Sequence, residues 1–212
     1  MINISNLVLT AAVVAISLFQ LSAAMCKGGI AHDGQIVGDA IVKSGKAFAT
    51  GNYSFKSVST GKYLQMQNPG NLVTPVTIAK VDDSTTWQVM NHETVYHSIH
   101  HLNNVKHPKC FGARWVKPPG CDDAVVLWQC EVDMGKRKRS LGKRYQPIRS
   151  DKELWLFVPV KNTTTKGAYL IVATAHLFDM TPACVVPVKV SGGTQLDSCL
   201  KPNAYWYINK QK

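Results

Sequence analysis

The chain of 212 residues is long enough for one globular domain or two small ones. Hydrophobic residues make up 45% of it, which allows a sizeable apolar core and argues against an intrinsically disordered protein. Lysine and arginine number 24 against 13 aspartates and glutamates, for a net charge of +11. Such a balance favours acidic partners: sulfated or sialylated glycans, anionic membrane surfaces or nucleic acid.

The first 24 residues carry no charged side chain and contain an apolar run from Leu7 to Leu21. This run is shorter than the roughly 20 apolar residues that span a membrane. It is followed by the small residues Ser22 to Ala24, which are typical of a signal-peptidase site. We therefore predict a signal peptide over residues 1–24 and a secreted protein, with an uncleaved anchor as the alternative. Residues 25–50, rich in Gly and Lys, are interpreted as an N-terminal extension.

All the cysteines follow the predicted cleavage point: Cys26, Cys110, Cys121, Cys130, Cys184 and Cys199. An even number of cysteines in a secreted chain indicates disulfides, but the sequence alone leaves their pairing open. No Cys-x-x-Cys pair occurs, which argues against a zinc ribbon or a thioredoxin-type redox site. Asn52 and Asn162 each begin an Asn-x-Ser/Thr sequon and are candidate glycosylation sites.

From Tyr53 onward, short apolar or alternating runs are separated by Gly, Pro, Asn and Asp. They are rich in β-branched and aromatic residues, which is typical of β-strands. No window of helical length shows a sustained period of 3.6 residues. Many short strands at near-regular spacing indicate an all-β sandwich or barrel. The runs lie at residues 53–58, 63–66, 76–79, 87–89, 95–99, 124–128, 154–158, 169–172 and 205–208.

A repeated order of anchors favours three copies of a four-strand unit. Each copy has an aromatic strand, a strand that begins near Cys or Tyr, an apolar strand and a closing tryptophan. The copies run from Tyr53 to Trp87, from Tyr96 to Trp155 and from Tyr169 to Trp206. One unit alone cannot bury its apolar face, so we expect the three to pack around a shared core that contains the closing tryptophans.

The pattern resembles the ricin B-type β-trefoil, whose repeat contains Cys-Leu-Asp, an apolar strand ending near Leu-Trp-x-Cys, and Gln-x-Trp. Residues 110–112 and 126–130 match the first two parts well, and residues 184–186 and 195–199 match more loosely. The resemblance implies a trefoil domain over residues 51–212 with disulfides Cys110–Cys130 and Cys184–Cys199. Cys26 and Cys121 remain as a third candidate pair. Another β-trefoil, or an unrelated disulfide-bonded β-domain, is the alternative.

In that family a working repeat binds a sugar through a stacking aromatic ring, the Asp of Cys-Leu-Asp and a polar residue near Gln-x-Trp. The three Asp positions here hold other residues: Gln65, Gly112 and Val186. The three Gln positions also differ: Thr85, Glu153 and Ala204. A site without its Asp loses one or two charge-assisted hydrogen bonds of roughly 1.5–3 kcal/mol each.

Only the second copy keeps a stacking aromatic, and the third has Asp197 at that position. A sugar site is therefore predicted in the second copy, from the following candidates: Trp128, Asp122, Asp123, Lys152 and Glu153. Packing of Trp128 within its strand is the alternative reading of that residue.

Between Lys136 and Arg149 lie seven positive charges and no acid. Mutual repulsion should keep this segment extended and solvated. Three interpretations compete. The segment is a solvated insertion without a partner, or a binding site for a sulfated glycan or another polyanion, or a site of proteolytic processing after Arg139. The polyanion-binding candidates are Lys136, Arg137, Lys138, Arg139, Lys143 and Arg144.

Five histidines crowd one region: His92, His97, His100, His101 and His107. We interpret them as solvated loop residues and predict no metal site, because three converging ligands cannot be derived from the sequence. On a strand, His97 and His101 would share a face and His100 would lie opposite. Motifs of serine hydrolases, zinc proteases and phosphate loops are missing, so no catalytic residue and no cofactor are predicted.

The sequence thus predicts a secreted, non-catalytic carbohydrate-binding module, biased by its charge toward anionic glycans on extracellular or host surfaces. The alternative is a secreted structural or interaction protein, or an effector, that keeps the trefoil and has lost sugar binding. Nucleic acid is not an expected partner of a secreted chain, and membrane contact would be peripheral at most.

Overall fold

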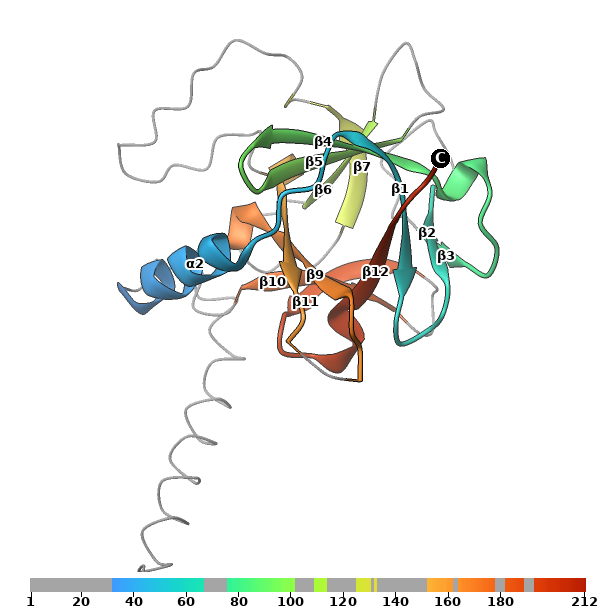
Figure 1. Ribbon diagram of the computed structural model, residues 1–212. Coiled ribbons are helices and arrows are strands. Elements are labelled where there is room, and N and C mark those ends of the chain that lie inside the picture. The colour runs from blue at the N-terminus through green and yellow to red at the C-terminus, as the bar shows by residue number, and fades with distance from the viewer. Residues whose placement is uncertain are drawn as a thin grey trace, which may run out of the picture.

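A computed structural model describes residues 32–66, 76–101, 109–113, 125–130, 132, 152–161, 164–177, 182–188 and 193–212 (Figure 1). Within these ranges the regular structure is mostly β-strand. The prediction of an all-β domain is confirmed.

The strands form three groups of four, called repeats one, two and three. Repeat one contains β1 (Gly51–Ser57), β2 (Tyr63–Gln65), β3 (Val76–Ile78) and β4 (Trp87–Glu93). Repeat two contains β5 (Tyr96–His101), β6 (Lys109–Ala113), β7 (Val125–Gln129) and β8 (Trp155–Pro159). Repeat three contains β9 (Ala168–Ala173), β10 (Ala183–Pro187), β11 (Thr194–Ser198) and β12 (Tyr205–Lys210). Short 3-10 helices are η2 (Asp83–Thr85), η4 (Thr174–His176) and η5 (Pro202–Ala204).

The same strand pairing occurs in every repeat. The first and fourth strands pair with each other and with the neighbouring repeats, which closes a barrel in the order β1, β4, β5, β8, β9 and β12. The second and third strands form a hairpin attached to the first strand of the repeat. A closed barrel with three hairpins is the β-trefoil arrangement that the resemblance implied.

Each repeat buries its closing tryptophan completely: Trp87, Trp155 and Trp206. Each indole Nε1 donates a hydrogen bond to a carbonyl oxygen of the second strand of its own repeat, at 2.7–3.0 Å. The acceptors are Leu64, Phe111 and Val185. A buried indole is thereby satisfied, and the hairpin is fastened to the barrel in the same way three times. The prediction that these tryptophans belong to the core is confirmed.

Phe48 fills the end of the barrel where the first strands begin. Its ring lies 5.2–6.0 Å from the rings of Tyr53, His97 and Tyr169. These three residues are equivalent, since each pairs in register with the closing tryptophan of its repeat. Asn91 Nδ2 donates to Phe48 O at 3.1 Å, which fixes the plug in place.

Residues 32–44 form a helix, α2 (His32–Ser44), where the sequence suggested an extension without a helical period. The helix places Ile41 and Val42 on an outer apolar cluster of the barrel that includes Leu156 and Val172. Because Gly34 and Gly38 are poor helix formers, this tertiary contact explains the helix better than propensity does. No helix of the described residues is long and apolar enough to cross a membrane.

Candidate functional site

The candidate site is built on the β6–β7 hairpin of repeat two. Its five residue pairs run in register from Lys109 opposite Gln129 to Ala113 opposite Val125. The disulfide Cys110–Cys130 closes the end of this hairpin, and Cys184–Cys199 does the same for β10–β11. Both disulfides implied by the family resemblance are therefore present.

Trp128 is the exposed aromatic residue of this hairpin. Val125 and Leu127 are buried in the core, whereas the side chain of Trp128 is 49% exposed. The amino group of Lys109 lies over its ring, 6.0 Å from the ring centroid. An exposed indole with a cation on one face suits the apolar face of a sugar ring, particularly one that carries an acidic group.

Glu153 comes close to the hairpin from the segment that leads into β8. Its side chain is buried, and its Oε2 accepts a hydrogen bond from the backbone N–H of Val132 at 3.2 Å. Gly112, where the family has its Asp, lies beside it: a Cβ at residue 112 would be 3.6 Å from Glu153 Cγ and 3.5 Å from Lys152 O. A carboxylate at residue 112 would thus stand next to a second carboxylate, which disfavours two ionised acids there.

The equivalent positions of the other repeats are built differently. In repeat three, Asp197 stands opposite Cys184 as Trp128 stands opposite Cys110, and it forms an ion pair with Lys201. Val186, at the Asp position, is fully buried. In repeat one, Ile78 pairs with Tyr63, and the Gln65 side chain donates to Ser84 Oγ at 2.6 Å. An exposed aromatic residue at this position therefore occurs in repeat two and not in its two sister repeats.

Histidines of β5 are buried, so the prediction of solvated loop histidines is wrong for His97, His100 and His101. They alternate along the strand as expected, with His97 and His101 facing the core. His97 stacks on Phe157 with ring centroids 4.6 Å apart, and its Nε2 accepts from the N–H of Phe48 at 2.9 Å. Burial lowers the pKa of His97 to about 4 and also lowers the pKa of His101, which lies edge-on to Trp87.

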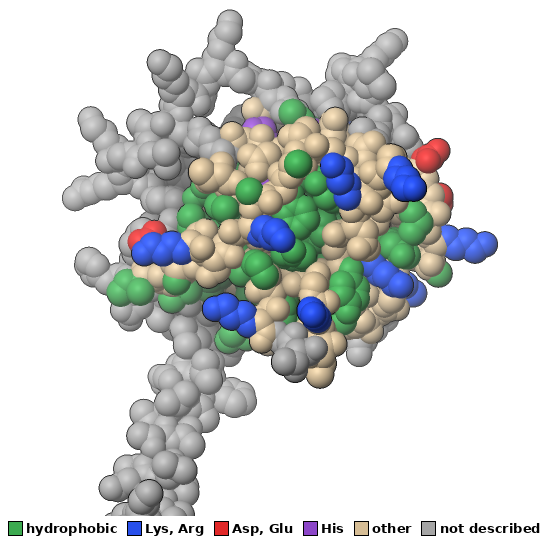
Figure 2. Space-filling model, viewed as in Figure 1, with side chains coloured by type: hydrophobic (Ala, Val, Ile, Leu, Met, Phe, Trp, Pro, Cys, Tyr) green, Lys and Arg blue, Asp and Glu red, His purple; other side chains and the backbone are tan. Residues whose placement is uncertain are grey.

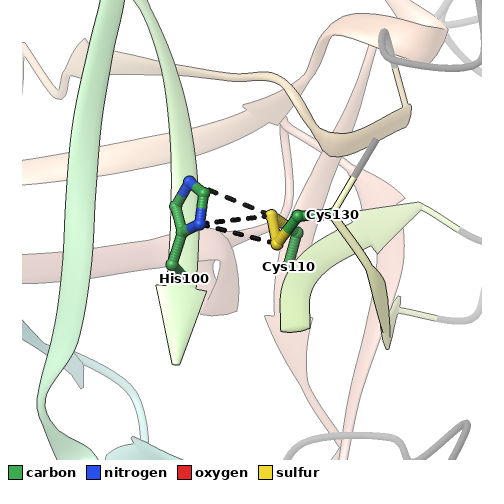
Figure 3. Close-up of side chains that lie close together, drawn as sticks. All are labelled: His100, Cys110 and Cys130. Atoms are coloured by element: carbon green, nitrogen blue, oxygen red, sulfur yellow. Dashed lines mark hydrogen bonds between the residues drawn. A yellow bond between two sulfur atoms is a disulfide. The ribbon is translucent and has the colours of Figure 1, made fainter. Parts of the chain in front are cut away.

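His100 lies on the opposite face, against the disulfide of repeat two (Figure 3). Its Nδ1 is 3.5 Å from Cys110 Sγ and 3.5 Å from Cys130 Sγ. Its Nε2 is hydrogen-bonded to Ser98 Oγ, which in turn lies 2.6 Å from His92 Nε2. Although one imidazole and two sulfurs converge here as metal ligands do, the sulfurs are bonded to each other and offer no thiolate.

Several predicted residues lie outside the described part of the chain: Cys26, Cys121, Asp122, Asp123, Lys136, Arg137, Lys138, Arg139, Lys143, Arg144, His107, Asn162 and the signal peptide. Of the remaining candidates, the structure brings Trp128 to the surface of the hairpin and places Lys152 and Glu153 beside Gly112. Asn52 is a half-buried residue of β1.

Sequence reasoning missed Lys109 as a partner of Trp128. In the hairpin register Lys109 is opposite Gln129 and Trp128 is opposite Cys110, so strand alternation would place the two side chains on opposite faces, and the pairing of β6 with β7 would not by itself have suggested the contact. It also missed the Ser98–His100 link, because the alternation of β5 predicted a shared face for these residues but not their burial.

No family model and no curated protein matches the chain. Solved structures do match, among them the designed threefold protein ThreeFoil, at 15% identity and a TM-score of 0.51 over 76% of this chain and 99% of that one. A salivary protein from Culex quiquefasciatus of the Cysteine and Tryptophan-Rich family is similar at 15% identity and a TM-score of 0.52, over 78% and 96%.

The Macrolepiota procera ricin B-like lectin, solved in complex with lactose, is similar at 9% identity and a TM-score of 0.50, over 78% and 99% of the two chains. Such identities carry the fold and nothing finer. The chain has the β-trefoil fold of ricin B-like lectins.

Proposed function

We propose that the chain is a secreted, non-catalytic carbohydrate-binding module whose glycan site lies in repeat two around Trp128. One observation carries this assignment: Trp128 is 49% exposed, whereas the three closing tryptophans are completely buried. About half of the surface of this indole is open to solvent, and sugars bind such rings through their C–H faces. The trefoil fold, which ricin B-like lectins share, supports the same function.

The ligand class follows from the charges around the ring. Lys109 lies over the indole, and Lys152 and the basic residues 136–144 belong to the same repeat. A sulfate or a sialic acid carboxylate beside the stacked ring would receive charge-assisted hydrogen bonds that a neutral sugar cannot form. Asp122 and Asp123 are proposed to accept hydrogen bonds from sugar hydroxyls, whereas Glu153 is buried against the N–H of Val132 and is a less suitable acceptor. We therefore propose sulfated or sialylated glycans as the ligands.

Secretion belongs to the same proposal. A signal peptide over residues 1–24 would deliver the chain to an oxidising compartment, where disulfides such as Cys110–Cys130 form and persist. In that compartment Asn52 and Asn162 would be available for glycosylation.

A second candidate function is favoured by Gly112 and Val186, which replace acids of the family pattern. Val186 is fully buried, and the space beside Gly112 is shared with Glu153. A trefoil changed in this way would serve as a secreted structural or interaction protein, or as an effector, that no longer binds sugar.

A glycan array that includes sulfated and sialylated glycans distinguishes the two candidate functions. We expect binding by the mature protein, a loss of at least about tenfold for Trp128→Ala, and retention for Trp128→Phe, which keeps an aromatic face. Leu200→Ala removes another exposed hydrophobic residue, 73% exposed, and should leave binding unchanged. Equal signals for Trp128→Ala and the parent protein would refute the site, and no binding by a folded parent protein would favour the second candidate.

A further inference from the structure

Lysines from distant parts of the chain lie at the end of the barrel that Phe48 fills, opposite the three hairpins. Lys46 precedes the plug residue Phe48, Lys161 and Lys166 lie in the connection between β8 and β9, and Lys210 ends β12. We call these four residues the lysine rim. Strands β1 and β9 begin at this end and strands β8 and β12 finish there, so antiparallel pairing brings the four residues to one end.

The backbone around the lysine rim is held in place by hydrogen bonds. The N–H of Lys46 donates to the carbonyl oxygen of Phe157 at 2.8 Å. The β8–β9 connection is closed by a bond from Val160 N to Ala168 O at 2.9 Å. Lys210 stands opposite Tyr53, and a Cβ placed on Gly51 would lie 3.5 Å from its Cε. The backbone that carries these lysines is therefore ordered without a ligand, and such preorganisation lowers the entropy cost of binding.

None of these four side chains is neutralised within the described part of the chain. All four are exposed, and none forms an ion pair there, whereas Lys201 pairs with Asp197 elsewhere on the molecule. Figure 2 shows lysine side chains spread over the face that carries β1 and β12, with the acidic side chains in view confined to its margins. The surface thus has uncompensated positive charge and attracts anions.

We propose that the lysine rim is a second binding surface, for a sulfated polysaccharide chain that lies across the end of the barrel. Several separated, fixed ammonium groups match a linear polymer with repeated sulfates, since each lysine contacts one anionic group as a point charge. A bilayer is a poorer match because the exposed large hydrophobic residues of the described chain belong to other segments than these lysines: Ile36, Val37, Val81, Trp128 and Leu200. This surface goes beyond the proposed glycan site, because it uses other residues at the other end of the barrel.

The test uses heparin as the probe and two charge-matched variants of the full mature protein. The rim variant is Lys161→Ala, Lys166→Ala and Lys210→Ala, and the control variant is Lys56→Ala, Lys62→Ala and Lys80→Ala, which removes the same charge from the region of β1 to β3. Both are made in a background with residues 136–139 changed to alanine, so that the basic segment does not mask the difference.

We expect the rim variant to bind heparin at least about tenfold more weakly than its background and to elute at lower salt, while the control changes by less than about twofold. Equal weakening of both variants would show a net-charge effect and overturn the proposal, as would no change in either. Tighter binding of anionic vesicles or of a DNA duplex than of heparin through the same three lysines would overturn the ligand class. On the glycan array, the three rim substitutions are tested in the protein that keeps residues 136–139, where the Trp128-dependent signals should remain, so a failure of one site is distinguishable from a failure of the other.

Discussion

The hairpins β6–β7 and β10–β11 are built on the same plan. Each has five residue pairs in register and ends in a disulfide, with cysteines 20 and 15 residues apart. In each, the carbonyl of the residue after the first cysteine, Phe111 or Val185, accepts the indole hydrogen bond of the closing tryptophan. The paired strands, the disulfide and the tryptophan hydrogen bond form a stabilising frame, which repeats two and three share.

What differs is the outer side of that frame. His100 pairs with Cys110 where Val172 pairs with Cys184, and Trp128 stands where repeat three has Asp197. Gly112 leaves room beside Glu153, whereas Val186 fills the corresponding position and is buried. A strand presents alternate residues to opposite faces, so the outward set can change without disturbing the inward set. At these outward positions repeat three has a buried Val186 and the ion pair of Asp197, whereas repeat two has the exposed aromatic ring of Trp128.

The largest expected effect tests the shared frame through its disulfides. Removal of a cross-link with 15 to 20 residues between its cysteines increases the entropy of the unfolded chain and should cost about 3 kcal/mol. We expect similar losses of unfolding free energy for Cys110→Ala with Cys130→Ala and for Cys184→Ala with Cys199→Ala. Urea unfolding of the two double variants measures this. A loss below about 1 kcal/mol in one hairpin only would show that the two frames are not equivalent.

A smaller effect, confined to acid, tests the position where repeat two has His97 and repeat three has Tyr169. The folded pKa of His97 is about 4 against an ordinary value of 6.5, so the unfolded chain binds the proton first as the pH falls. The contribution of neutral His97 is complete above pH 6.5 and is lost between pH 6.5 and 4, by about 3 kcal/mol in total.

His97→Gln keeps an acceptor for the N–H of Phe48 but cannot take up a proton. Its unfolding free energy should therefore fall less than that of the parent protein between pH 7 and pH 4.5, by about 2–3 kcal/mol. Comparison of each protein with itself at pH 7 removes the direct cost of the substitution. His101, whose pKa is also lowered, leaves a residual slope of the same sign. Parallel pH profiles for the two proteins would contradict the assignment to His97.

The barrel could be predicted from sequence because its determinants are local or repeated. Alternating residue types mark β1 and β2 in the sequence, and the closing tryptophans recur at the same place in each unit. The disulfides required the family resemblance, since spacing alone leaves the pairing open. The helix α2 was missed because contacts of Ile41 and Val42 with strands far along the chain stabilise it.

Burial of the histidines could not be read from their spacing. Composition suggests solvated imidazoles, but His97 fits among Phe48, Asn91 and Phe157, three residues from separate parts of the chain. For the candidate site, the sequence motif identified Trp128. The cation of Lys109 over its ring and the close approach of Gly112 to Glu153 follow from how the hairpin folds and packs. Local patterns therefore locate a residue, and its chemistry follows from contacts that only the fold supplies.

The smallest expected effect concerns the outward position of repeat three. Asp197 forms an ion pair with Lys201, whose side chain is 53% exposed, so the pair is screened by water and salt. Asp197→Asn should lower the unfolding free energy by about 0.2–1 kcal/mol at low ionic strength and by less in 1 M salt. Trp128→Asp, the reciprocal change, removes the exposed aromatic ring of repeat two and should abolish glycan binding there. A loss of glycan binding in Asp197→Asn as well would place the sugar site in repeat three and reverse the comparison between the hairpins.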